Sequence, residues 1–179
     1  MLSWVRAGKA ILPALVSLAP GMAASAGASQ APAPHARVEL VAAAGAIAPG
    51  RDLWLGIHFV LEPGWHIYWQ NPGDSGGPPT VQWRLPDGLA AGELEWPLPE
   101  RIEAGASIVN YGYEGEVVLP VRLRATGGWT QGGATVAALV KYVICRDICV
   151  PGRADVELAV PVLYRTHALA DPGPRKRSS

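Results

Sequence analysis

The stretch LWLGIHFVL, residues 53–61, indicates which kind of secondary structure builds this protein. Large apolar side chains alternate along it with smaller or polar ones, the pattern of a β-strand with one buried face and one open face. The residues expected to face the core are Leu53, Leu55, Ile57, Phe59 and Leu61. The residues expected on the opposite face are Asp52, Gly56 and His58. The odd-numbered positions of this strand should therefore line a hydrophobic core.

Similar short runs lie on both sides of this strand. They cover residues 38–44, 65–69, 80–85, 94–101, 117–124, 134–144 and 154–162. The 21 glycines and 17 prolines separate these runs, and the Gly/Pro-rich stretch 71–79 is expected to be a long loop. No window has the 3.6-residue period of a helix. Eight or nine short strands predict an all-β fold of the immunoglobulin-like antiparallel β-sandwich kind, with a barrel as the alternative.

The first 26 residues have the pattern of a secretory signal peptide. Arg6 and Lys9 precede an apolar run at 10–19, and small residues follow it. The run is shorter than the roughly 20 residues that span a bilayer. We expect a flexible segment at 27–36, the folded domain at 37–164 and a disordered tail at 165–179.

The charge of the chain argues against a nucleic-acid partner. The full sequence holds 15 basic and 15 acidic side chains, and two of the basic ones, Arg6 and Lys9, lie in the predicted leader. The rest of the chain is thus slightly acidic and offers no basic face to phosphates. We therefore expect no nucleic-acid binding.

Two cysteines, Cys145 and Cys149, lie between two strand-like runs, in the expected turn of a β-hairpin. An even cysteine count in an exported protein suggests a disulfide. A structural disulfide closing so short a loop would stabilise the fold by only about 2 kcal/mol. A copper(I) site would use both thiolates and a histidine such as His58 or His66. A redox dithiol is the third possibility, with Arg146 beside Cys145 favouring the thiolate. The local pattern leaves these roles open.

Several segments, in order along the chain, carry a resemblance to a known family. They are GWHIYWQNPGDSG at 64–76, WPLPERI at 96–102, NYGYEGEV at 110–117, LPV at 119–121 and CRDICVP at 145–151. Together they resemble the N-terminal periplasmic domain of the thiol:disulfide reductase DsbD, in particular its ScsB-like branch associated with copper tolerance. DsbD itself is associated with cytochrome c biogenesis.

The resemblance implies an immunoglobulin-like fold and a redox role for Cys145 and Cys149, with no organic cofactor and no metal. We expect Cys145 to form the mixed disulfide and Cys149 to resolve it. The implied partners are periplasmic thioredoxin-like or disulfide-isomerase-like proteins, with a membrane-embedded electron donor. The family shields its cysteines with an aromatic cap loop, which maps here to residues 110–116.

The cap candidates in that loop are Tyr111 and Tyr113, with the glycines at 112 and 115 as hinges. Glu114 is expected to raise the pKa of the nearby thiol by repelling its thiolate. In the best-matching segment, Trp65 is expected to pack in the core together with Trp69. His66 alternates to the other face of that strand, where we expect it to be exposed or hydrogen-bonded.

Overall fold

The computed structural model describes residues 31–43, 47, 52–105, 107–126 and 133–161. The predicted signal peptide at 1–26 and tail at 165–179 lie outside these residues. Within the described ranges no helix is long and apolar enough to cross a bilayer. The described chain forms strands β1 (Ala31–Ala33), β2 (Ala36–Ala42), β3 (Asp52–Leu61), β4 (His66–Gly73), β5 (Thr80–Arg84), β6 (Leu89–Leu94), β7 (Glu100–Glu103), β8 (Val109–Glu114), β9 (Glu116–Ala125), β10 (Gly133–Cys145) and β11 (Cys149–Pro161).

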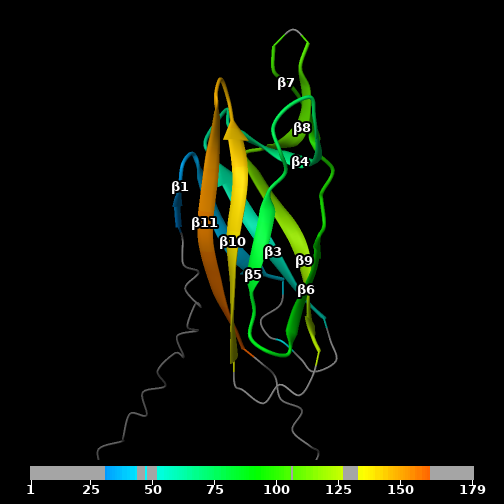
Figure 1. Ribbon diagram of the computed structural model, residues 1–179, viewed down its shortest axis with the longest axis vertical. Helices are drawn as coiled ribbons and strands as arrows, with labels where there is room; N and C mark the ends of the chain where they lie inside the picture. Colours follow the sequence, from blue (N-terminus) through cyan, green and yellow to red (C-terminus); the bar gives the residue numbers. More distant parts are fainter. Residues whose placement is uncertain (1–30, 44–46, 48–51, 106, 127–132, 162–179) are drawn as a thin grey trace, which may run out of the picture.

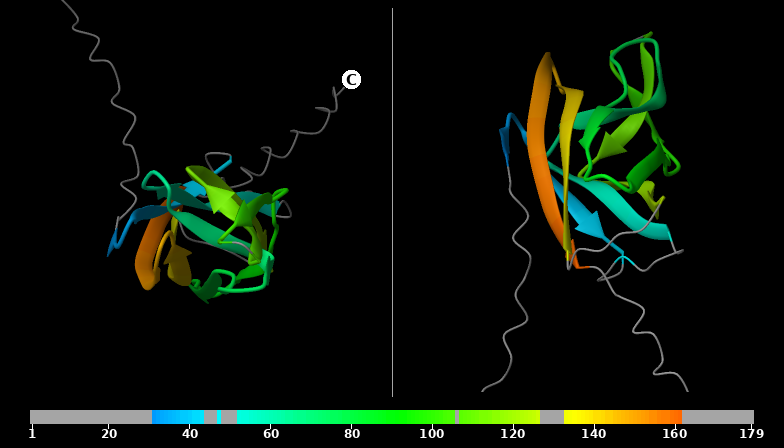
Figure 2. Two further views of the ribbon diagram at one scale, coloured as in Figure 1. Left: turned by 90° about the horizontal axis from the view of Figure 1, so that it is seen from above. Right: turned by 60° about the horizontal axis from the view of Figure 1, so that its bottom comes forward.

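The strands form two antiparallel sheets, which confirms the predicted all-β immunoglobulin-like sandwich. One sheet has the order β1-β2-β3-β9-β6, and the other has the order β11-β10-β4-β8-β7, with β5 also paired to β10. Seen from above, the two sheets lie as separate layers (Figure 2). The long hairpin of β10 and β11 rises at one side of the molecule, and β7 and β8 rise at the other (Figure 1).

The hydrophobic core lies between the sheets and follows the alternation in the sequence. Leu53, Leu55, Ile57, Phe59 and Leu61 of β3 are all buried, as predicted. Alternate residues of β2, β9, β10 and β11 complete the core from both sheets. The ring of Phe59 meets that of Tyr142 edge-on at 5.3 Å, which joins the layers across the core. The fold is thus held by side chains whose positions the period-two pattern determines.

Three segments differ from the sequence-based expectations. Residues 31–33, expected in a flexible segment, pair with β2 as strand β1, because an open sheet edge accepts a further strand. The expected loop at 71–79 is extended as far as Gly73, which pairs with Asn110 of β8. The expected cap loop at 110–116 is instead most of β8, a turn at Gly115 and the first residue of β9. The first difference comes from a local hairpin with β2, and the other two come from pairing between β4 and β8, which lie far apart in the sequence.

Candidate redox site

The two cysteines lie at the tip of the β10–β11 hairpin. Cys145 is the last residue of β10 and Cys149 the first of β11, and the two are cross-strand partners whose Cα atoms are 4.1 Å apart. They form a disulfide. The backbone N–H of Arg146 donates to the carbonyl of Ile148 at 3.0 Å and closes the turn between them. The β10–β11 hairpin by itself therefore holds the two cysteines next to each other.

The two sulfurs differ in their access to solvent. Cys145 is 2% exposed, whereas Cys149 lies in the exposed turn. A partner's thiolate can reach only a sulfur that is open to it. We expected Cys145 to form the mixed disulfide, and the structure instead presents Cys149. The difference arises because Cys145 lies on β10, an inner strand that pairs with β4, whereas Cys149 lies on β11, an edge strand of the same sheet.

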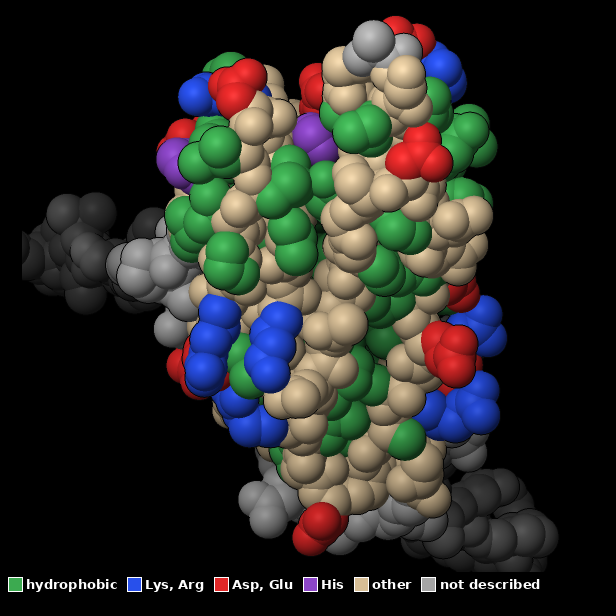
Figure 3. Space-filling model, turned by 45° about the horizontal axis from the view of Figure 1, so that its top comes forward, with side chains coloured by type: hydrophobic (Ala, Val, Ile, Leu, Met, Phe, Trp, Pro, Cys, Tyr) green, Lys and Arg blue, Asp and Glu red, His purple; other side chains and the backbone are tan. Residues whose placement is uncertain are grey.

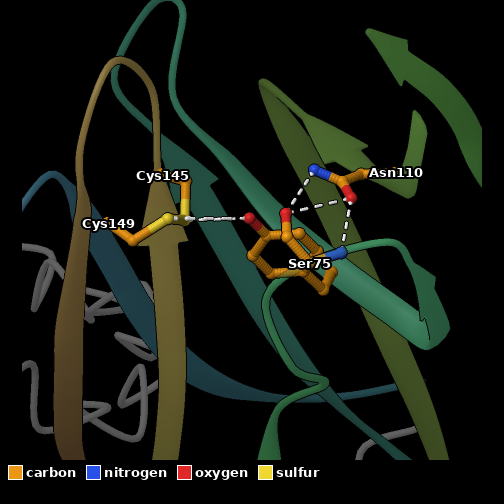
Figure 4. Close-up of a disulfide and its surroundings, with 5 residues drawn as sticks. Ser75, Asn110, Cys145 and Cys149 are labelled. Carbon is orange, nitrogen blue, oxygen red and sulfur yellow. Dashed lines mark hydrogen bonds between the residues drawn. A yellow bond between two sulfur atoms is a disulfide. The ribbon is translucent and has the colours of Figure 1, made fainter. Parts of the chain in front are cut away.

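A tyrosine that the sequence did not single out touches the disulfide. Tyr68 of β4 is 1% exposed, and its hydroxyl donates to the Cys145 Sγ at 2.9 Å and lies 3.8 Å from the Cys149 Sγ (Figure 4). The run at 65–69 carried a signal for this role. Four of its five residues, all but His66, are aromatic or apolar, which is typical of a strand covered on both sides.

A short loop covers Tyr68 on the side away from the core. A Cβ added at Gly76 would lie 2.1 Å from the Tyr68 ring, and Gly76 has a φ of +79° that favours glycine. Asn110, 1% exposed, fixes this loop, because its Oδ1 accepts from the N–H of Ser75 at 3.0 Å (Figure 4). Asp74 adds a carboxylate oxygen that accepts from the N–H of Val109 at 2.8 Å. Loop 74–76 is thus hydrogen-bonded to β8 and packs closely against the Tyr68 ring.

His66 lies beside the same sulfur and is buried, contrary to the expected exposure. It is 5% exposed and its Nε2 has no hydrogen-bond partner. It is the cross-strand partner of Cys145 on β10 and of Glu114 on β8, and its ring meets Tyr68 edge-on at 5.2 Å. Burial lowers the pKa of His66 from 6.5, and the negative charge of Glu114 opposes that shift.

Neither predicted cap tyrosine faces the disulfide. In β8, Tyr111 and Tyr113 point to the opposite face from Gly112 and Glu114, because successive residues of a strand alternate. Tyr113 is a core residue whose hydroxyl donates to the carbonyl of Pro97 at 2.8 Å, and burial raises its pKa to about 12. Tyr111 is 37% exposed and pairs with Arg101.

The other predicted cap residues also have different surroundings. Glu114 faces His66 rather than the thiol directly. Gly112 lies inside the sheet, paired with Tyr68 of β4 on one side and Glu100 of β7 on the other, rather than at a hinge. The group that covers the sulfur thus comes from β4 and loop 74–76.

Arg146 in the turn is held by an aromatic stack. Its guanidinium lies 5.1 Å from the ring centroid of Trp65, and the His35 ring stacks on Trp65 at 3.8 Å. Trp65 is buried in the core, as predicted, and Trp69 packs against the core in part. The Nε of Arg146 also pairs with Asp147 at 3.2 Å, which offsets its charge toward the sulfurs. The stack anchors the turn to the body of the sandwich.

The copper(I) alternative finds no prepared ligand set. Among the described residues no three or more His, Cys, Asp or Glu side chains are grouped so that they could hold a metal ion. His58, one of its two candidate ligands, already bonds Glu39 and Glu116 on the outside of the other sheet. Copper binding stays a prediction.

Comparison with known proteins agrees with this geometry. Residues 37–161 match the family described as "Thiol:disulfide interchange protein DsbD, N-terminal". The crystal structure of the N-terminal periplasmic domain of ScsB from Proteus mirabilis is similar, at 25% identity and a TM-score of 0.50. The match covers 72% of this chain and 47% of that one, so this chain spans about half its length. No curated protein matches. The matched family covers most of the chain, and the protein therefore belongs to the family of DsbD N-terminal domains.

Proposed function

We propose that this domain carries reducing equivalents between other proteins by thiol–disulfide exchange at Cys149. The observation that carries the proposal is the asymmetry of the pair. An exposed sulfur at Cys149 is bonded to a buried one at Cys145, whose Sγ accepts a hydrogen bond from Tyr68. An exposed sulfur receives the partner, and a buried, hydrogen-bonded sulfur is a stabilised leaving group.

Reduction and oxidation of the domain each take two steps. During reduction of the oxidised domain, a donor's thiolate attacks the Cys149 Sγ. The Cys145–Cys149 bond breaks and Cys145 leaves as a thiolate. The donor's second thiol then attacks its own sulfur in the mixed disulfide and releases Cys149, so two electrons have entered the domain. When the domain is oxidised by its next partner, the Cys149 thiolate attacks the partner's disulfide. Cys145 then attacks the Cys149 Sγ and releases the reduced partner.

Tyr68 assists both directions of this exchange. Its hydroxyl donates to the Cys145 Sγ, and a donor hydrogen bond favours the thiolate over the thiol. Cys145 carries negative charge when it leaves and again when it attacks. A hydrogen bond to a charged group is worth about 1.5–3 kcal/mol.

The proposed setting is the periplasm. The similar ScsB domain is described as periplasmic, and the leader predicted at residues 1–26 would direct export. The proposed partners are thioredoxin-like or disulfide-isomerase-like proteins, with a membrane-embedded domain as the electron donor. They would meet the end of the molecule that carries the hairpin tip. Figure 3 shows this end hollowed between two raised parts, with hydrophobic side chains inside the hollow and charged ones on its rims.

The reduction potential of the Cys145–Cys149 couple tests the proposal. The purified domain is equilibrated in glutathione redox buffers, and the fraction of free thiol is measured after acid quenching. A value of roughly −120 to −270 mV, the range of exchange proteins, supports electron transfer. A value below about −300 mV marks a structural disulfide and overturns the proposal.

A further inference from the structure

The buried position of Cys145 raises the question of where its proton goes. Cys145 is 2% exposed, so water has little access to the proton that a thiol gains or loses in each cycle. The Tyr68 hydroxyl is a hydrogen-bond donor to this sulfur, so it does not accept the thiol proton in that arrangement. A further group has to exchange that proton with Cys145.

His66 has the position for this task. It lies directly across from Cys145 in the β4–β10 pair, and residues directly opposite in such a pair have Cβ atoms about 4.5–5.5 Å apart. The side chain is 5% exposed and its Nε2 has no partner in the oxidised protein. A buried polar atom without a partner is unfavourable unless another state of the protein provides one. Reduction creates a thiol on the residue directly opposite His66, which can supply that partner.

The charges around His66 suit a proton acceptor. Burial lowers its pKa from 6.5, so the ring is neutral at pH 7 and its nitrogen lone pair is free. Glu114, on the other neighbouring strand, raises that pKa and stabilises the imidazolium once it forms. Tyr68 faces the ring from the same strand and Cys145 from β10. Arg146 follows Cys145, but its guanidinium lies over Trp65 and pairs with Asp147.

We propose that His66 is the proton-transfer residue of Cys145, with Glu114 as its charge partner. The proposal rests on the exchange function proposed above. When Cys145 attacks a mixed disulfide on Cys149, its S–H proton moves to the His66 Nε2. The new Cys145–Cys149 bond forms while the bond from Cys149 to the partner's sulfur breaks. The partner leaves as a thiolate with the electron pair. The imidazolium then releases this proton to solvent. In the opposite direction His66 first takes up a proton from solvent and gives it to Cys145 as that sulfur leaves.

The test follows the ring-closing step with glutathione as the probe. Reduced protein is mixed with glutathione disulfide, and acid-quenched samples are analysed by mass spectrometry for the Cys149 adduct and for the closed disulfide. The wild-type closing rate should change little between about pH 6.5 and 8.5. In H66Q the closing rate should fall about tenfold for each unit by which the pH is lowered. It then follows the thiolate fraction, which decreases in this way below the ordinary thiol pKa of about 8.5.

H58Q is the matched control, since His58 lies on the outer face of the other sheet. It should follow the wild-type profile. Capture of glutathione by exposed Cys149 is an internal control that H66Q should leave unchanged. If H66Q closes the disulfide with the wild-type pH profile, the proposal is overturned.

A second measurement needs no variant. The His66 ring is titrated by NMR in oxidised and in reduced wild-type protein. Its pKa should fall further on reduction, because the S–H of Cys145 then donates to the neutral ring and so favours the unprotonated form. The same pKa in both states overturns the proton-transfer role. If instead wild-type protein does not react with glutathione at all, the exchange function fails first, and the two failures are thereby distinguished.

Discussion

Each sheet of this sandwich carries a histidine on its outward face, and the two histidines have opposite surroundings. His58 of β3 bonds Glu39 through one ring nitrogen at 2.9 Å and Glu116 through the other at 2.7 Å. His66 of β4 is buried, and its Nε2 has no hydrogen-bond partner. On the outward face around His58, which is partly buried, both ring nitrogens of the histidine are hydrogen-bonded. The face around His66 is closed over a sulfur and keeps one polar atom unsatisfied, as functional sites often do.

Substitution of either cysteine should have the largest effect on the chemistry of the covered face. Cys149→Ser should lose all capture of glutathione, because the remaining thiol of Cys145 is buried. Cys145→Ser should still capture glutathione on Cys149 but never release it by ring closure. Both variants lack the disulfide and should lose about 2 kcal/mol of stability while they keep the fold. Mass spectrometry of the adducts and near-ultraviolet circular dichroism check this.

Two outcomes would contradict the assignment. If Cys149→Ser forms the adduct at the wild-type rate, Cys145 is the accessible sulfur. If either variant does not fold, the disulfide is a structural element and the redox role loses its support.

Substitution of two neighbouring glycines tests whether loop 74–76 holds Tyr68 against the disulfide. In Gly76→Ala the new methyl would lie 2.1 Å from the Tyr68 ring, at a backbone conformation that disfavours alanine. We expect a loss of about 1–3 kcal/mol in the free energy of unfolding and faster reduction of the disulfide by dithiothreitol. A Cβ at Gly77 meets nothing within 4 Å, so Gly77→Ala should stay within about 0.5 kcal/mol of wild type. Equal effects of the two changes would show that loop 74–76 does not hold Tyr68.

The hydroxyl of Tyr68 can be tested apart from its ring. Tyr68→Phe keeps the cover but removes the donor to the Cys145 Sγ. We expect reduction by dithiothreitol to slow about tenfold, equivalent to about 1.4 kcal/mol, because the leaving thiolate loses a charge-assisted hydrogen bond. Tyr111→Phe is the control, since Tyr111 points to the other face of the sheet. Equal rates in the two variants would remove Tyr68 from the mechanism.

The smallest expected effect is on stability as a function of pH. Because the folded protein lowers the pKa of His66, the unfolded chain binds more protons as pH falls below 6.5, and acid therefore destabilises the fold. The stability of H66Q should lack this contribution. The wild-type free energy of unfolding, minus that of H66Q, should decrease as pH falls through this window in urea titrations. A difference that stays constant with pH would contradict the shift.

The sequence predicted the solvated parts of this fold better than the covered ones. The alternation at 53–61 gave the buried residues of β3 directly, since a strand with one wet face records its orientation in its own residues. The run at 65–69 predicted Trp65 in the core, but it did not predict that His66 is buried with an unpartnered Nε2, on a face where Gly76 packs against Tyr68. Local patterns do not show which distant loop will cover a strand.

The site was predicted in part for the same reason. The redox role of the cysteine pair was predicted from the family resemblance, since the local pattern left it open. Tyr68 was not, since its role depends on a strand pairing and on Gly76, both distant from the cysteines. The resemblance pointed to Tyr111 and Tyr113, and the alternation of β8 turns both away from the sulfur.

The hairpin that carries the cysteines also determines how redox state and folding are coupled. All 13 residues of β10 are paired with β11, so the cysteines stay adjacent when their bond is broken. In a thermodynamic cycle, the stability difference between the oxidised and reduced protein equals the difference in disulfide free energy between the folded and unfolded chain. A loop this short keeps that difference near 2 kcal/mol. That difference is small beside the roughly 5–15 kcal/mol of stability usual for a folded domain, so we expect the oxidised and the reduced protein both to remain folded. The reduction potential is then determined by the atoms that surround the two sulfurs.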